Sequence, residues 1–152
     1  MKKITVSQIQ EAALSFKGEI VQTPPVFSAK KISGKPAYYY ARNDIGHEKL
    51  KGLKASNVNI YSIEVKSFDG LDGIMSIGCS SGTYVRSIVN DLGKMLGCGA
   101  TLTHLTRDSI GRFELGDSIA ADDIEKIAEV QNMKLFEAGI LSMEKIEQLK
   151  YL

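Results

Sequence analysis

The amino-acid sequence predicts a single domain of the α+β class. Its 152 residues are 43% apolar and 24% charged, which are ordinary values for a globular chain long enough to bury a core. Segments with helical periodicity follow segments with strand alternation, and no internal repeat or low-complexity run interrupts them. No apolar run approaches the roughly 18 residues that a membrane span needs.

The first predicted element is a helix over residues 5–16. Thr5 and Gln8 have the spacing of a capping box, in which each side chain satisfies a backbone N–H group of the other. Four apolar residues share one face of this helix: Val6, Ile9, Ala13 and Phe16. Gly18 ends the helix, and residues 19–23 form a short extended segment before two prolines.

A basic, aromatic stretch follows. Residues 25–36 form a loop by composition, and their mixture of one aromatic ring, lysines and glycine suits a surface that follows an RNA backbone. Residues 37–42 predict a short helix in which Tyr38 and Arg42 are one turn apart, and at least one of its three consecutive tyrosines should be exposed. Residues 30–54 carry seven Lys and Arg against two acids, a charge that suits phosphate contacts or simply marks a solvated basic loop.

Two strands joined by a tight connection come next. Residues 58–68 are rich in β-branched side chains, and their apolar parity switches near Ile60 and Tyr61, which predicts a bulge or bend. Residues 68–73 contain two Asp-Gly pairs, the signal of a hairpin. Residues 74–80 then alternate as a half-buried strand.

The stretch from Cys79 to Gly93 is the one around which the chain is organised. Gly82 breaks the strand, a helix begins at Val85, and Gly97 is its natural stop. Arg86 lies in the first turn, where the helix dipole disfavours a cation by roughly half a kcal/mol, so a carboxylate or phosphate is expected to meet it. Tyr84 lies two residues earlier at the turn. The alternative is a partly buried tyrosine and an arginine paired with any surface acid.

The remaining chain is acidic. Residues 107–113 predict a last strand, residues 117–130 an amphipathic helix, and Ser142 can cap a final short helix. Two cysteines and two distant histidines form no metal-ligand cluster, and no cofactor motif is present. No signal peptide follows Met1, and few cysteines suit a reducing cytoplasm, so we expect a cytoplasmic protein without metal or cofactor.

Several ordered motifs together resemble the TruB family of tRNA pseudouridine synthases, over about residues 5–119. In chain order they are Gln22-x-Pro24-Pro25-x-Phe27-Ser28-Ala29-x-Lys31-x-x-Gly34, Ala37-Tyr38-x-x-Ala41-Arg42, Cys79-Ser80-x-Gly82-Thr83-Tyr84-Val85-Arg86 with Asp91-Leu92-Gly93, and Leu105-x-Arg107 with Gly111-x-Phe113. Four ordered blocks are far more specific than any one of them, and weigh against a chance match in an unrelated α+β interaction protein.

The resemblance implies a mixed, mainly antiparallel sheet flanked by helices, and an isomerase that needs no cofactor. In that family an aspartate helps to break the glycosidic bond of a flipped-out T-loop uridine, and the base is rejoined through carbon. Tyr84 would lie near the uracil, Arg86 would pair with the aspartate, and Leu105 would line the pocket. An insertion at about residues 24–54 would grip the T-arm of tRNA, through Phe27, Ser28, Lys30, Lys31, Lys35, Tyr38 and Arg42.

One departure from the family shapes the prediction for activity. The family's aspartate lies in a Gly-x-Leu-Asp motif upstream of the matched region, so we expect this chain to be the C-terminal portion of a catalytic domain and inactive alone. Asp72, Asp91 and Asp108 are poor substitutes by their positions. Arg86 should then be unpaired or face solvent. Apolar sheet edges should be exposed unless the absent segment or a second copy of the chain covers them. The alternative is a non-catalytic RNA-binding module derived from this fold.

Overall fold

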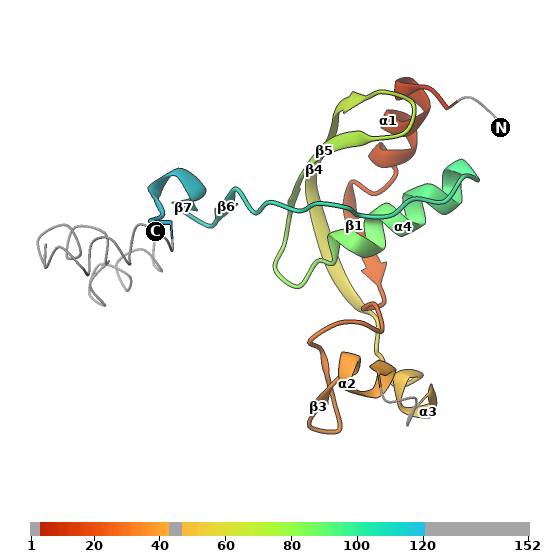
Figure 1. The fold of residues 1–152 in the computed structure, drawn as a ribbon, viewed down its shortest axis with the longest axis vertical. Helices are drawn as coiled ribbons and strands as arrows, with labels where there is room; N and C mark the ends of the chain where they lie inside the picture. The colour runs from red at the N-terminus through yellow and green to blue at the C-terminus, as the bar shows by residue number, and fades with distance from the viewer. Residues whose placement is uncertain (1–3, 43–46, 121–152) are drawn as a thin grey trace, which may run out of the picture. The chain divides into compact units, whose positions relative to one another are not determined.

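The computed structural model describes residues 4–42 and 47–120. The chain divides into two compact units, residues 1–103 and 104–152. Figure 1 follows the chain through the elements of each unit. No helix in the described ranges is long and apolar enough to cross a membrane.

The first unit is built on a three-stranded antiparallel sheet of order β1-β4-β5. Its strands are β1 (Gly18–Gln22), β4 (Ser56–Phe68) and β5 (Gly73–Cys79). The register between β4 and β5 shifts between Ile60 and Ser62, which confirms the predicted bulge. The predicted hairpin is also confirmed, because β4 and β5 are joined by a tight turn in which Gly70 has φ 108°.

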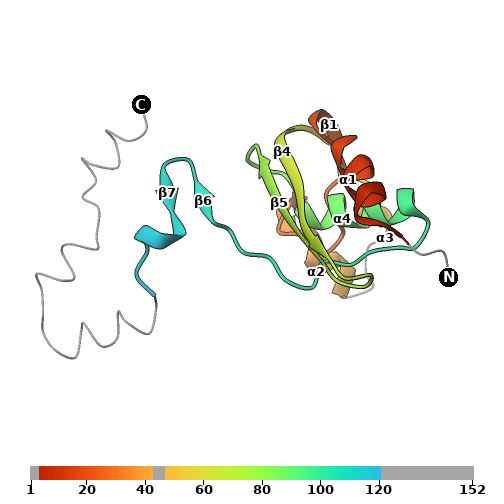
Figure 2. The ribbon, with the colours of Figure 1, turned by 90° about the horizontal axis from the view of Figure 1, so that it is seen from above.

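Two helices pack against one face of this sheet, α1 (Val6–Leu14) and α4 (Val85–Leu96) (Figure 2). The buried core between them and the sheet consists of Ile9, Ala13, Ile60, Ile63, Ile88 and Leu92. The capping box is confirmed, since Gln8 N–H donates to Thr5 Oγ1 at 3.3 Å and Thr5 N–H donates to Gln8 Oε1 at 3.0 Å. The helix ends at Leu14, slightly earlier than predicted.

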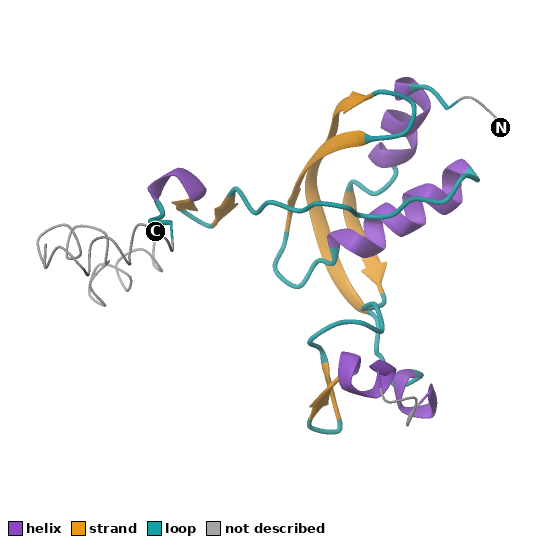
Figure 3. Cartoon of the chain, viewed as in Figure 1, coloured by secondary structure: helices purple, strands orange, loops and turns teal. Residues whose placement is uncertain are grey.

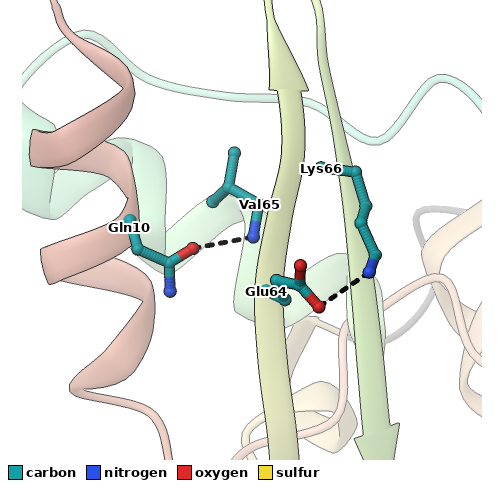
Figure 4. A network of polar contacts seen from close by, with 4 residues as sticks. All are labelled: Gln10, Glu64, Val65 and Lys66. Carbon is teal, nitrogen blue, oxygen red and sulfur yellow. Dashed lines mark hydrogen bonds and ion pairs between the residues drawn. The ribbon is translucent and has the colours of Figure 1, made fainter.

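A glutamine fastens α1 to the sheet (Figure 4). The half-buried Gln10 accepts a hydrogen bond from Val65 N–H through Oε1 at 2.8 Å. β1 pairs with β4 only as far as Ile60, so in the described chain Gln10 supplies an acceptor that the β1 ladder does not offer. Glu64 and Lys66, on either side of Val65, form an exposed ion pair at 2.7 Å.

Residues 23–55 form an insertion that leaves and re-enters the sheet at the paired residues Gln22 and Ser56. It contains β2 (Lys31–Ile32), β3 (Lys35–Pro36), α2 (Ala37–Arg42) and α3 (His47–Leu50). The predicted helix over residues 37–42 is confirmed. The stretch predicted as a plain loop is in part a hairpin, because Ser33 and Gly34 both take positive φ values, as a tight two-residue turn requires.

The second unit begins with β6 (Ser109–Ile110), β7 (Phe113–Glu114) and the short 3-10 helix η1 (Leu115–Asp117) (Figure 3). The prediction of one strand over residues 107–113 is wrong, because the chain reverses at Gly111, whose φ is 59°. The predicted helix does not begin at Asp117, since residues 118–120 are not helical. The rest of that helix, and the one capped by Ser142, fall outside the described residues. The described elements confirm the α+β class.

Candidate functional site

Tyr84 and Arg86 lie where β5 passes into α4, as the sequence predicts. Gly82 has φ 81°, and Thr83 Oγ1 donates to Ser80 O at 2.8 Å, so the connection is a tight turn. Tyr84 is the N-cap residue of α4, is half-buried, and makes no capping hydrogen bond through its side chain. Arg86 is exposed in the first turn of the helix.

Gln22 holds the backbone of Tyr84 from the end of β1. Its Oε1 accepts from Tyr84 N–H at 2.7 Å, and its Nε2 donates to Tyr84 O at 3.1 Å. The Gln22 side chain is only 6% exposed, and a buried amide is tolerated when both of its polar ends are satisfied. Gln22 belongs to one of the ordered motifs but has no role predicted from the sequence, where a polar residue at the end of a predicted strand is the only signal.

Arg86 has a partner in the insertion. Its guanidinium donates to the backbone carbonyl of Phe27 at 3.0 Å, across 59 residues of sequence. Arg86 is therefore not left unpaired, although its side chain is exposed to solvent as the alternative expectation has it. Carbonyl oxygens carry partial negative charge, so this contact offsets part of the unfavourable position of a cation at a helix N-terminus. Within residues 4–42 and 47–120, no carboxylate forms an ion pair with Arg86.

A pocket of about 620 Å³ lies beside this contact. It is formed by the end of β1, one side of α4 and the chain that follows α4, and it includes Gln22, Arg86, Asn90, Lys94 and Thr101. Its border is polar, with Arg86, amide and hydroxyl groups, and the ion pair that Lys94 forms with Asp91 at 3.0 Å. Arg86 is the cation on this border without an ion-pair partner among the described residues.

The insertion carries cations placed over tyrosine rings. Lys35 Nζ lies 4.2 Å from the centre of the Tyr39 ring, and Arg42 Cζ lies 5.7 Å from that of Tyr38. Tyr40 is buried and donates through its hydroxyl to Ile32 O at 3.2 Å. The centre of its ring lies 5.2 Å from Lys49 Nζ. Tyr38 and Tyr39 are exposed, which confirms that the three tyrosines cannot all face a core. Such contacts reduce the freedom of the long cationic side chains.

The other residues predicted to bind RNA divide by exposure. Phe27 is 54% exposed, and Lys30 and Lys31 are also on the surface. Ser28 is 6% exposed, and its Oγ has no hydrogen-bond partner among the described residues. The backbone of Ser28 instead holds the insertion together, since its carbonyl accepts from Tyr38 N–H at 3.1 Å.

The three aspartates rejected as substitutes occupy structural positions. Asp72 lies in the β4–β5 turn, where its carbonyl accepts from Asp69 N–H at 3.1 Å. Asp91 pairs with Lys94 at 3.0 Å on α4, and Asp108 accepts from Leu115 N–H through its backbone.

A fourth aspartate, Asp69, lies in the same β4–β5 turn as Asp72. The pKa of Asp69 is lowered because its carboxylate accepts hydrogen bonds from the backbone N–H of Leu71, which has the larger effect, and from that of Asp72.

Leu105 belongs to the second unit, where it is 57% exposed. Its position relative to Tyr84 and Arg86 stays a prediction. In the described part of the chain, no three His, Cys, Asp or Glu side chains lie close enough to hold a metal ion.

Comparison with known families matches nearly the whole chain. The model for the TruB family pseudouridylate synthase (N terminal domain) matches residues 1–85. The model for the tRNA pseudouridylate synthase B C-terminal domain matches residues 86–147.

Relatives named tRNA pseudouridine synthase B are similar to this chain over most of its length. A tRNA pseudouridine synthase B of Chlamydia felis is 45% identical over 119 residues, covering 78% of this chain and 48% of that protein. One of Tolumonas auensis is 35% identical over 145 residues, covering 95% of this chain and 42% of that protein. The chain thus spans less than half the length of these relatives. A chain in the crystal structure of a Cbf5-Nop10-Gar1 complex matches with a TM-score of 0.69 and 26% identity, over 93% of this chain and 38% of that one.

Proposed function

Because this chain belongs to the TruB family of pseudouridylate synthases, we propose that it grips the T-arm stem-loop of tRNA and presents Tyr84 and Arg86 to a flipped-out uridine. The reaction is isomerisation of that uridine to pseudouridine, in which the glycosidic bond to nitrogen breaks and a bond to carbon of the same base forms. It consumes no oxidant, reductant or cofactor.

One observation carries the proposal. The Arg86 guanidinium bonds to the carbonyl of Phe27 at 3.0 Å, so the segment predicted to bind RNA and the segment predicted to meet the uridine touch each other. RNA held by the insertion is then delivered next to the turn that carries Tyr84. The two predicted roles would have been hard to combine had these segments lain at opposite ends of the unit.

The described groups fit the steps that such an enzyme needs. Lys30, Lys31, Lys35 and Arg42 supply exposed cations for phosphates, which dominate recognition of an RNA stem. Extruding a base costs a few kcal/mol of lost stacking, and an aromatic ring such as that of Tyr84 recovers about 1–3 kcal/mol. Arg86 then pairs with the nucleophilic aspartate of the family's Gly-x-Leu-Asp motif, giving up or sharing its bond to Phe27.

We propose that these 152 residues alone bind T-arm RNA without isomerising it. From the family resemblance, we also propose that Leu105 lines the uridine pocket. The exposed apolar side chains of the sheet, Val21 at 72% and Ile74 at 66%, would be covered by the polypeptide that brings the aspartate or by a second copy of the chain. Both cysteines are free thiols, which agrees with a reducing compartment such as the cytoplasm.

The test is pseudouridine formation on a T-arm stem-loop. The chain alone, in large excess, should bind the stem-loop and form no pseudouridine. Adding a polypeptide that carries the Gly-x-Leu-Asp region should start the reaction. Turnover by the chain alone would overturn this division of labour and make Asp72 the first residue to substitute.

A second candidate function is RNA binding without catalysis. It is favoured by one observation, that no carboxylate in the described ranges pairs with Arg86. Tight binding of the stem-loop, with no pseudouridine even after the second polypeptide is added, would select it.

A further inference from the structure

Gln22 bonds to Tyr84 in a way that few side chains could reproduce. Both ends of its amide engage one residue, accepting from Tyr84 N–H at 2.7 Å and donating to Tyr84 O at 3.1 Å. The two residues are 62 positions apart in the sequence, and Gln22 is 6% exposed. A backbone segment held on both its N–H and its C=O has little freedom to rotate.

Tyrosine is a poor choice for the position that Tyr84 occupies. N-cap positions favour Ser, Thr, Asp and Asn, whose side chains accept from the first free N–H groups of the helix. Tyr84 makes no such bond. The ring at this position therefore serves another purpose than capping, and Gln22 supplies from β1 the restraint that the N-cap side chain does not.

We propose that Gln22 is a positioning residue for Tyr84, fixing the backbone from which the Tyr84 ring meets the substrate base. The part of this inference that concerns the uridine rests on the function proposed above. Gln22 also borders the same pocket as Arg86, and Tyr84, whose backbone it holds, lies two positions before Arg86 in the chain.

The RNA-gripping segment is held by different bonds. The carbonyl of Ser28 accepts from Tyr38 N–H at 3.1 Å, and that of Lys30 accepts from Ala37 N–H at 2.8 Å. Neither of these bonds involves Gln22, so we expect both to survive the loss of its amide. We therefore expect it to slow the reaction far more than it weakens RNA binding, a separation that a general loss of stability would not give.

Gln10 provides a matched control. It is also a glutamine that bonds a backbone N–H from a distant element, but its partner is Val65 (Figure 4). Gln22→Met and Gln10→Met keep the length of each side chain and remove its hydrogen bonds. In the 152-residue chain supplied with the aspartate-bearing polypeptide, Gln22→Met should lower the single-turnover rate of pseudouridine formation at least tenfold. The Kd for the stem-loop should change less than threefold, and Gln10→Met should change neither by more than twofold.

The two glutamines also differ in how they bond. Gln10 acts toward Val65 only as an acceptor, whereas Gln22 both accepts and donates. An ionised carboxylate accepts but cannot donate, so the two Gln→Glu variants are compared at a pH high enough to ionise both substituted side chains. Gln10→Glu should therefore leave the rate unchanged, while Gln22→Glu should slow it. Equal rates in these two variants would overturn the proposal.

Amide exchange of Tyr84 separates this inference from the proposed function. If the unsubstituted chain with its added polypeptide neither binds the stem-loop nor forms pseudouridine, the proposed function fails. The positioning role is then decided by exchange alone: Tyr84 N–H should exchange at least tenfold faster in Gln22→Met and at the original rate in Gln10→Met. Unchanged exchange in Gln22→Met, or faster exchange with an unchanged reaction rate, would overturn the inference.

Discussion

Substitution of Gly93 by alanine tests how α4, the helix that carries Tyr84 and Arg86, is held in place. Gly93 is buried in α4 against the chain that returns over the helix. A Cβ atom on Gly93 would lie 2.7 Å from the Cβ of Ala100 and closer still to backbone atoms of Gly99 and Ala100. The Gly93 carbonyl also accepts from Cys98 N–H at 3.2 Å and from Gly99 N–H at 2.9 Å. Helix propensity alone predicts that Gly93→Ala stabilises by about 1 kcal/mol.

The packing predicts the opposite sign. Backbone atoms must move to relieve the overlap, which costs about 1–3 kcal/mol, and weakening two hydrogen bonds costs about 1 kcal/mol each. After the gain in propensity, a net destabilisation of about 2–4 kcal/mol is expected in urea unfolding followed by circular dichroism. Gly116→Ala is the control, since no atom lies within 4 Å of the added Cβ, and it should change stability by less than about 0.5 kcal/mol. A Gly93→Ala chain as stable as the unsubstituted one would refute the reasoning.

Three further predictions concern the surface, the turn and the hairpin. Lys35→Ala and Arg42→Ala should each weaken stem-loop binding and reduce the salt slope of log affinity by about one; Lys66→Ala, which alters a charge on β4, should do neither, and an equal loss there would contradict a localised RNA surface. Tyr84→Leu should slow pseudouridine formation about 5- to 150-fold through lost stacking, whereas Tyr84→Phe keeps the ring and should stay within a few-fold; equal slowing by both would argue against stacking. The lowered pKa of Asp69 means that its contribution to stability is present above the ordinary value of 3.8 and is lost as pH falls through the lower folded value. Asp69→Ala should therefore reduce the thermal midpoint near neutral pH, and the difference from the unsubstituted chain should vanish in acid.

Much of the fold followed from the sequence because its signals are local. The capping box of Thr5 and Gln8, the helix over residues 37–42 and the stop at Gly97 each depend on residues within a few positions of one another. The same holds for the turn that places Tyr84 and Arg86. Where prediction failed, a short reversal was missed: Gly111 reverses what reads as one strand, and two residues of positive φ close a hairpin inside an apparent loop. A run of β-formers has the same pattern whether it continues or folds back after two residues.

The bonds that assemble the candidate site were decided only by the tertiary structure. Gln22 meets Tyr84 across 62 residues, and Arg86 meets Phe27 across 59. In both pairs one partner is a backbone group, which every residue possesses, so the identity of that partner leaves no mark in the sequence. The sequence determined by itself which side chains have the chemistry to act. Which backbone atoms hold those side chains in place depends on how β1, the insertion and α4 come together, because only packing over long separations brings such groups within hydrogen-bonding distance.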